Sequence, residues 1–146
     1  MTNRSKRNII FILIAIALAS SIYGYFLWNK PHKDIKNATG IKTSAINLYN
    51  TFRADSIKAK TTFLNRIVEV SGIVKSVSLN NDKKQIILLR TSMADASINC
   101  TVEESKLTVQ TGDSISLKGM CVGYMGGDEE MGLPGDVYLI RCYKSI

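Results

Sequence analysis

The feature that most constrains this chain is an uncharged, largely apolar run of 20 residues, IIFILIAIALASSIYGYFLW, from Ile9 to Trp28. A helix of about 20 apolar residues crosses the roughly 30 Å hydrocarbon core of a bilayer. Tyr23, Tyr25 and Trp28 lie at the far end of the run, where aromatic rings favour the headgroup level. The sequence therefore predicts a short basic tail, residues 1–8, followed by a transmembrane helix, residues 9–28.

A cleaved signal peptide is the alternative interpretation of this run. Arg4, Lys6 and Arg7 precede it, and Ala17-Leu18-Ala19 resembles a cleavage site. The apolar residues continue past that point into the aromatic cluster, which favours a retained signal anchor. Basic residues lie on both sides of the run, since Lys30, Lys33 and Lys36 follow it, so the positive-inside rule gives almost no bias. The very short N-terminal tail before a signal-like apolar run favours an orientation with the N-terminus inside and the rest of the chain outside.

The formal net charge of +7 is concentrated beside the apolar run. Seven of the 19 basic residues precede Thr43, against one of the 12 acidic residues, Asp34. The remainder carries 12 basic and 11 acidic residues and is close to neutral. The basic charge therefore suits anionic lipid headgroups, and it does not indicate a nucleic-acid-binding domain.

Residues 29–42 are polar and without a clear period, so they are expected to form a linker to a domain over residues 43–146. Thr43 or Ser44 can cap a first helix and Asp55 or Ser56 a second. The apolar stripe predicted on these helices consists of Ala45, Leu48, Tyr49, Phe52, Ile57, Ala59 or Lys60, and Phe63.

After Arg66 the apolar period changes from 3.6 residues to 2, which indicates strands. Five strands are expected, over residues 66–78, 86–90, 96–102, 115–123 and 137–145. A brief helical turn and a Gly-Asp turn are expected within residues 103–113. The residues predicted to face inward are Val68, Val70, Gly72, Val74, Ser76, Ile98, Cys100, Val102, Ile115, Leu117, Gly119, Cys121 and Gly123.

This order of elements is that of a mainly β protein with a five-stranded OB-fold barrel, preceded by an amphipathic helix and the transmembrane helix. Gly72 suits the bend of a long first strand that serves both halves of the barrel. A five-stranded meander with a helix is the alternative.

The stretches AINLYNTFRADSIKAKTTFLNR, IVEVSGIVKSV, INCTV, TGDSISLKGMCVGY and VYLIRC resemble the tRNA-anticodon-binding-like (tRNA_anti-like) OB-fold family of small bacterial proteins, which often carry an N-terminal membrane segment. The resemblance covers residues 43–146 and implies the fold, but no established substrate or reaction. The long loop after Tyr124 departs from the short connection expected there. The matching positions are Leu48, Phe52, Ala59, Phe63, Gly72, Cys100, Gly112, Gly119, Cys121 and Cys142.

Three cysteines, Cys100, Cys121 and Cys142, fall on expected strands. Their wide spacing, with His32 as the only histidine, does not fit a structural zinc site, so no metal is predicted. In an oxidising compartment a Cys121–Cys142 disulfide would stabilise a small barrel by about 2–4 kcal/mol. Buried free thiols that act as small apolar residues are the alternative. No histidine or carboxylate adjoins them in sequence, so a catalytic thiol is not expected.

The loop MGGDEEMGLPGD, residues 125–136, joins the fourth and fifth strands. In OB-folds this loop and the one between the first two strands flank the usual binding face. Four glycines are expected to leave the acidic loop mobile, and a solvated flexible loop without a ligand is the alternative. The candidate binding residues are Asp128, Glu129, Glu130, Asp136, Lys83, Lys84 and Arg90.

Other functions have less support in the sequence. The expected binding face offers no aromatic residue on which bases could stack, and neither paired carboxylates with a histidine nor a phosphate-cradling loop is present. We therefore expect no enzyme, no cofactor and no small-molecule substrate. The prediction is a binding or adaptor module of the bacterial inner membrane, with a periplasmic domain that recognises an envelope protein or glycan. A cytoplasm-facing domain that binds RNA or single-stranded DNA is the alternative.

Overall fold

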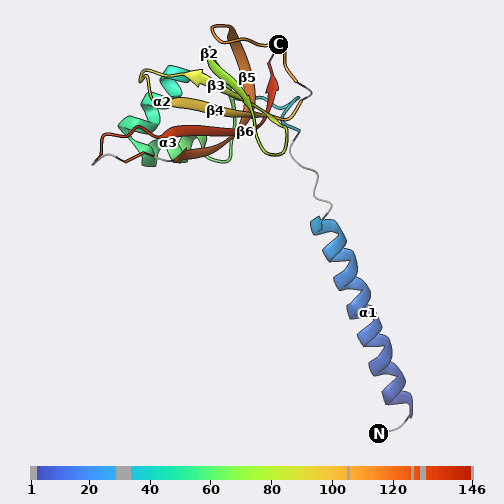
Figure 1. Cartoon of the computed structure of the whole chain (residues 1–146). Coiled ribbons are helices and arrows are strands. Elements are labelled where there is room, and N and C mark those ends of the chain that lie inside the picture. Colours follow the sequence, from blue (N-terminus) through green and yellow to red (C-terminus); the bar gives the residue numbers. More distant parts are fainter. Residues whose placement is uncertain (1–2, 29–33, 105, 126, 129–130, 146) are drawn as a thin grey trace. The chain divides into compact units, whose positions relative to one another are not determined.

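The computed structural model describes residues 3–28, 34–104, 106–125, 127–128 and 131–145, without the side chains of residues 3–7, 9–11 and 13. The chain divides into two compact units, Met1–Lys33 and Asp34–Ile146. Figure 1 shows a single helix in the first unit and a β barrel with two helices in the second. Each unit is described by itself.

The first unit contains helix α1, Asn3–Trp28. The hydroxyls of Ser20 and Ser21 donate to the carbonyls of Ile16 and Ala17, four residues earlier, so these polar groups are satisfied within the helix. The predicted helix over residues 9–28 is confirmed. In the part of the chain that the structure describes, no helix is long and apolar enough to cross a membrane, and the transmembrane assignment stays a prediction.

The second unit is built on a closed five-stranded barrel. Its strands are β2 (Ile67–Leu79), β3 (Gln85–Arg90), β4 (Ser97–Val102), β5 (Ser114–Met125) and β6 (Asp136–Lys144). They pair in the order β2-β3-β4-β6-β5 and back to β2. Only the β4–β6 pair of the barrel is parallel. This pairing is that of an OB-fold, and the predicted mainly β barrel is confirmed.

Strand β2 serves both halves of the barrel. Its first part pairs with β5 and its second part with β3, with a β-bulge between Val74 and Ser76. The extra residue reverses the alternation, so Val77 packs against the core and pairs with the buried Ile87. The expectation that Ser76 faces inward was therefore wrong. A Cβ at Gly72 would lie 2.9 Å from the Cβ of Ala45, which explains the glycine.

Strand β1, Ile41–Ser44, was not expected from the sequence. It pairs in parallel with β2, from Ile41 opposite Val68 to Ser44 opposite Ser71. Its first two residues lie in the range predicted as linker, where Ile35 is also buried. Four residues are too few to show an alternation of apolar and polar side chains, so the pairing with β2 makes this segment a strand.

Two helices follow β1, and both begin where the sequence predicts. In α2 (Ala45–Ala54) the Ser44 hydroxyl accepts from the Asn47 amide at 3.1 Å. In α3 (Ser56–Phe63) the Asp55 carboxylate accepts from the Lys58 amide at 2.9 Å. Helix α2 contacts β2, β3, β4 and β6, and α3 contacts β5. Helix α2 therefore covers one end of the barrel (Figure 1).

The helical turn predicted between the third and fourth strands was wrong, because the described residues of 103–113 contain no helix. The Gln85 side chain donates to the Leu107 carbonyl at 3.0 Å and accepts from the Leu107 amide at 2.8 Å. Leu107 and Val109 both pack on the core. The hydrogen bonds from Gln85 and these apolar contacts hold Leu107 and Val109 against the barrel.

Candidate functional site

The outer face of β3, β4 and β6 is the first candidate site. The register places Leu88 of β3 opposite Asn99 of β4, and Asn99 opposite Tyr138 of β6. These three side chains form a row, and all are partly exposed. Ile86 and Thr101 form the next pair. An aromatic residue therefore lies on the face where the sequence analysis expected none. Tyr138 was missed because that analysis considered two strands, whereas the parallel β4–β6 pairing adds the third.

A pocket of about 310 Å³ lies where this face ends. It is lined by Lys75, Arg90, Thr91, Met93, Ala94 and Ala96. The Lys75 ammonium donates to the carbonyls of Ala94 and Ala96, at 2.6 and 3.5 Å. Arg90 is exposed, and within the described residues its guanidinium has neither a hydrogen bond nor an ion pair. We call this the Lys75–Arg90 pocket.

A second pocket of about 300 Å³ lies between α2, the β3–β4 loop and the β5–β6 loop. Its lining is Tyr49, Arg53, Met93, Tyr124, Gly132, Leu133 and Pro134. The Tyr49 hydroxyl donates to the sulfur of Met93 at 3.5 Å. Burial raises the pKa of Tyr49, and the neighbouring Tyr124 raises it further. The Tyr49 phenol is therefore neutral at physiological pH.

The described residues of the acidic loop make several contacts. Asp128 and Leu133 exchange two backbone hydrogen bonds, of 2.8 and 2.9 Å, and form an antiparallel bridge. Cβ atoms at Gly127 and Gly135 would lie 2.9 Å from the Gly135 nitrogen and 2.7 Å from the Tyr124 ring. A side chain at either position would therefore clash with its neighbours, which explains the two glycines.

The acidic candidate residues have different environments. The Asp128 carboxylate accepts a hydrogen bond from the Met131 amide at 3.1 Å, within the same loop. Asp136 accepts from the amide and hydroxyl of Ser97, at 2.7 and 2.9 Å, so it joins β4 to β6. Glu129 and Glu130 lie outside the described residues.

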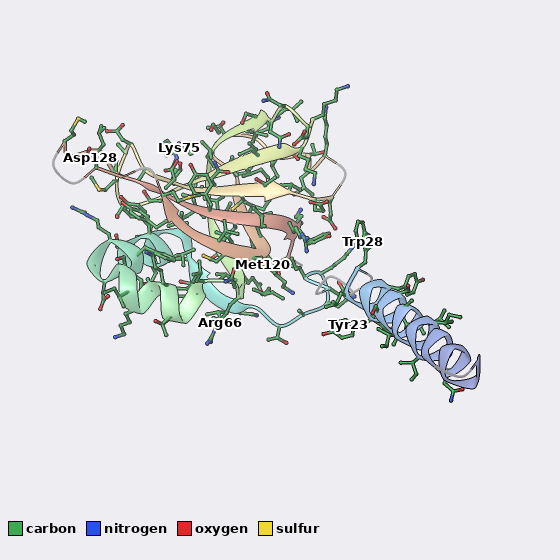
Figure 2. All side chains as sticks on the ribbon, turned by 90° about the horizontal axis from the view of Figure 1, so that it is seen from below. Tyr23, Trp28, Arg66, Lys75, Met120 and Asp128 are labelled. Carbon is green, nitrogen blue, oxygen red and sulfur yellow. The ribbon has the colours of Figure 1, made fainter. Side chains whose placement is uncertain are left out.

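The basic candidate residues do not lie together. Lys84 forms an ion pair with Glu103 at 2.8 Å, and Lys83, with φ 61°, lies in the β2–β3 turn. Arg90 is at the other end of β3, about 17 Å away at the usual rise per residue. Figure 2 shows Lys75 and Asp128 toward the upper left and Arg66 toward the bottom of the view. The structure thus brings Arg90 near Lys75.

The three cysteines are free and fully buried in the core of this structure, which contains no Cys121–Cys142 bridge. Cys121 is opposite Leu139, and Cys142 lies three residues further along β6, past a register shift. The Cys142 thiol occupies the place of a Gly119 side chain, 2.5 Å from where its Cβ would lie.

The environment of the thiols is that of core residues. A hydrogen bond with Cys100, together with burial, raises the pKa of Cys142 well above its usual value. Burial raises the pKa of Cys121 to about 11. Protonated, buried thiols are poor nucleophiles. Among the described residues, no group of three or more His, Cys, Asp or Glu side chains is placed to hold a metal.

Comparisons with known proteins place this fold in a family. A putative aspartyl-tRNA synthetase from Leishmania major Friedlin is similar over 80% of this chain and 22% of its own, with 7% identity and a TM-score of 0.44. An aspartyl tRNA synthetase from Entamoeba histolytica is similar over 54% of this chain and 18% of its own, with 12% identity and a TM-score of 0.37.

The chain thus spans about a fifth of the length of these synthetases, and at such TM-scores the similarity supports no inference about its function. No curated protein matches the chain. The model of the tRNA_anti-like family matches residues 1–131, which is most of the chain and includes four of the five barrel strands, β2 to β5. The chain therefore belongs to the tRNA_anti-like family.

Proposed function

We propose that this chain is a membrane-anchored OB-fold binding module that recognises an envelope protein or glycan. The binding surface is the outer face of β3, β4 and β6, and the observation that carries the proposal is the row Leu88, Asn99 and Tyr138. OB-folds use the outer surface of their second and third strands for oligosaccharides and oligonucleotides. Tyrosine offers an apolar ring with a polar end, which suits a sugar ring or a peptide.

The charge distribution favours a protein or glycan over nucleic acid. Single-strand binders need a cationic track along the bound backbone. Lys84 is paired with Glu103 at one end of the face, and unpaired cationic charge is found at the other end, at Arg90. The row between them is uncharged. RNA or single-stranded DNA bound by a cytoplasm-facing domain is the alternative, and Arg90 with Tyr138 is its support.

The proposed location rests on the sequence. The uncharged run 9–28 with basic residues on both sides favours an anchor in the bacterial inner membrane, and the short N-terminal tail favours a periplasmic domain. An alkaline phosphatase fused to the C-terminus should then be active in intact cells. Activity found only in a cytoplasmic reporter fused at the same point would reverse the orientation.

A photo-crosslinking experiment tests the binding face. A photoreactive phenylalanine derivative would replace Tyr138, and in a matched variant Tyr143, a partly exposed tyrosine of the same strand that pairs with Lys118. After illumination of intact cells we expect a discrete protein or glycan adduct from position 138 and little from position 143. Equal adducts from both positions, or none, would contradict the proposal, and an adduct removed by nuclease would favour the alternative.

A further inference from the structure

The Lys75–Arg90 pocket has features that the proposed binding face does not use. Its lining contains two cationic side chains and no acidic one. Asp95, in the same loop, is exposed and is not part of the lining, and Asp136 is engaged by Ser97. The pocket is therefore a place where a negative charge would meet two positive ones.

The two cations retain donors for a ligand. The Lys75 ammonium has three N–H groups and uses two of them on the Ala94 and Ala96 carbonyls. These bonds hold its position and leave one donor. The Arg90 guanidinium has no bond within the described residues, so its fork of donors can receive both oxygens of a carboxylate.

Apart from the two cations, the lining consists of Thr91 and three apolar residues. The Thr91 hydroxyl donates to the carbonyls of Met93 and Ala96. We call the three apolar residues, Met93, Ala94 and Ala96, the apolar wall. Arg90 also lines an adjoining pocket of about 140 Å³, together with Ser44, Ala45, Ile46, Ser71, Gly72 and Ile73. Ile46 and Ile73 are 52% and 46% exposed, and burial of such apolar surface by a ligand is favourable.

We propose that the Lys75–Arg90 pocket binds a carboxylate carried on an apolar stem, such as the free C-terminus of a protein or a small organic acid. The carboxylate lies between the two cations and the stem lies on the apolar wall. A hydrated inorganic anion would satisfy the charges and leave the apolar surface uncovered. The proposal does not depend on the identity of the partner at the outer face.

Matched ligands test the chemistry on the full-length chain in lipid nanodiscs. N-acetyl-leucine carries a carboxylate on an apolar stem, and N-acetyl-leucinamide differs only by the missing charge. In isothermal titration we expect the carboxylate to bind about tenfold or more tightly than the amide, because hydrogen bonds to charged groups are the strong ones. Two further ligands distinguish the sources of the carboxylate. Tighter binding of a tetrapeptide that ends in leucine indicates a protein C-terminus, and tighter binding of 4-methylpentanoate indicates a small organic acid.

Variants then locate the site. Arg90→Gln should lower the affinity for N-acetyl-leucine about tenfold or more, and Arg90→Lys should retain part of it, because lysine keeps the charge without the planar fork. Arg66→Gln is the control, since Arg66 is also exposed and does not line the pocket. Equal binding of acid and amide, equal losses in Arg90→Gln and Arg66→Gln, or binding of inorganic phosphate in place of both organic acids would overturn the proposal.

Discussion

At one end of strand β3, next to the turn 80–84 and the segment 103–113, the polar side chains are engaged with one another. Lys84 is paired with Glu103, and Gln85 forms both of its hydrogen bonds with the Leu107 backbone. At the other end, Arg90 has no partner within the described residues, and two pockets of about 300 Å³ lie between the loop 91–96 and its neighbours. We call these the paired end and the pocket end.

The difference indicates where binding chemistry is available. A charge that already has a partner must lose it before it can bind a ligand, whereas an exposed unpaired guanidinium loses only water. At the paired end, Gln85 holds Leu107 against the barrel. An aromatic cluster packs beside the pocket end, where Tyr49 and Tyr124 line the second pocket. The ring centroids of Phe52 and Tyr124 lie 6.3 Å apart, and those of Phe52 and Phe63 lie 6.1 Å apart.

The largest effect is expected in the aromatic cluster beside the pocket end. Phe52→Ala should reduce the free energy of unfolding by about 3–5 kcal/mol, the usual cost of truncating a buried phenylalanine, because Phe52 is 1% exposed. Urea denaturation measures this loss. Ile57→Ala, on an α3 residue that is 78% exposed, should stay within about 0.5 kcal/mol. A similar loss in both variants would contradict a special contribution of the cluster to stability.

A smaller effect is expected at the paired end. Gln85→Met should cost about 1–3 kcal/mol, because the Leu107 amide loses its partner inside the domain and the Leu107 carbonyl keeps one, the Val109 amide. Hydrogen exchange of the Leu107 amide should accelerate in this variant, while ligand binding at Arg90 stays unchanged. The exposed Gln110→Met serves as the control. If ligand binding at Arg90 weakens as well, the two ends are not independent.

The smallest effect is expected from the surface ion pair. Lys84→Ala should change the free energy of unfolding by less than about 1 kcal/mol, because an exposed ion pair is screened by water and salt. The difference from wild type should shrink further as salt is added. Lys83→Ala, in the same turn, provides the comparison. A loss well above 1 kcal/mol that persists at high salt would mean that the pair orders the segment 103–113.

Much of the fold was predictable because its signals are local. The caps Ser44 and Asp55 and the alternation on five strands were read from neighbouring residues, and the structure confirms them. The prediction of a helical turn within residues 103–113 was wrong. Gln85, about 20 residues earlier in the chain, forms hydrogen bonds with the backbone of Leu107, and the sequence gives no sign of this distant contact. The predicted inward orientation of Ser76 was wrong, because the bulge between Val74 and Ser76 can be recognised only when the pairing with β3 is known.

The candidate site was less predictable. Arg90 was chosen from the sequence and does line a pocket, whereas Lys84 was chosen and proves to be paired. Tyr138 was not selected as a binding residue, because its place beside Asn99 depends on a parallel strand pair. The hydrogen bonds of Lys75 to carbonyls of the β3–β4 loop also join residues distant in the chain.

The sequence by itself determined most of the helices and strands and most of the buried side chains, because periodicity and capping are properties of adjacent residues. Strand β1, the phase of Ser76 and the exposed Ile57 are exceptions. Only the tertiary structure decided which strands are neighbours. It thereby placed Tyr138 on the outer face, Arg90 beside Lys75 and the three thiols in one core. Strand order depends on contacts between residues far apart in the chain, and these leave no pattern in a single sequence.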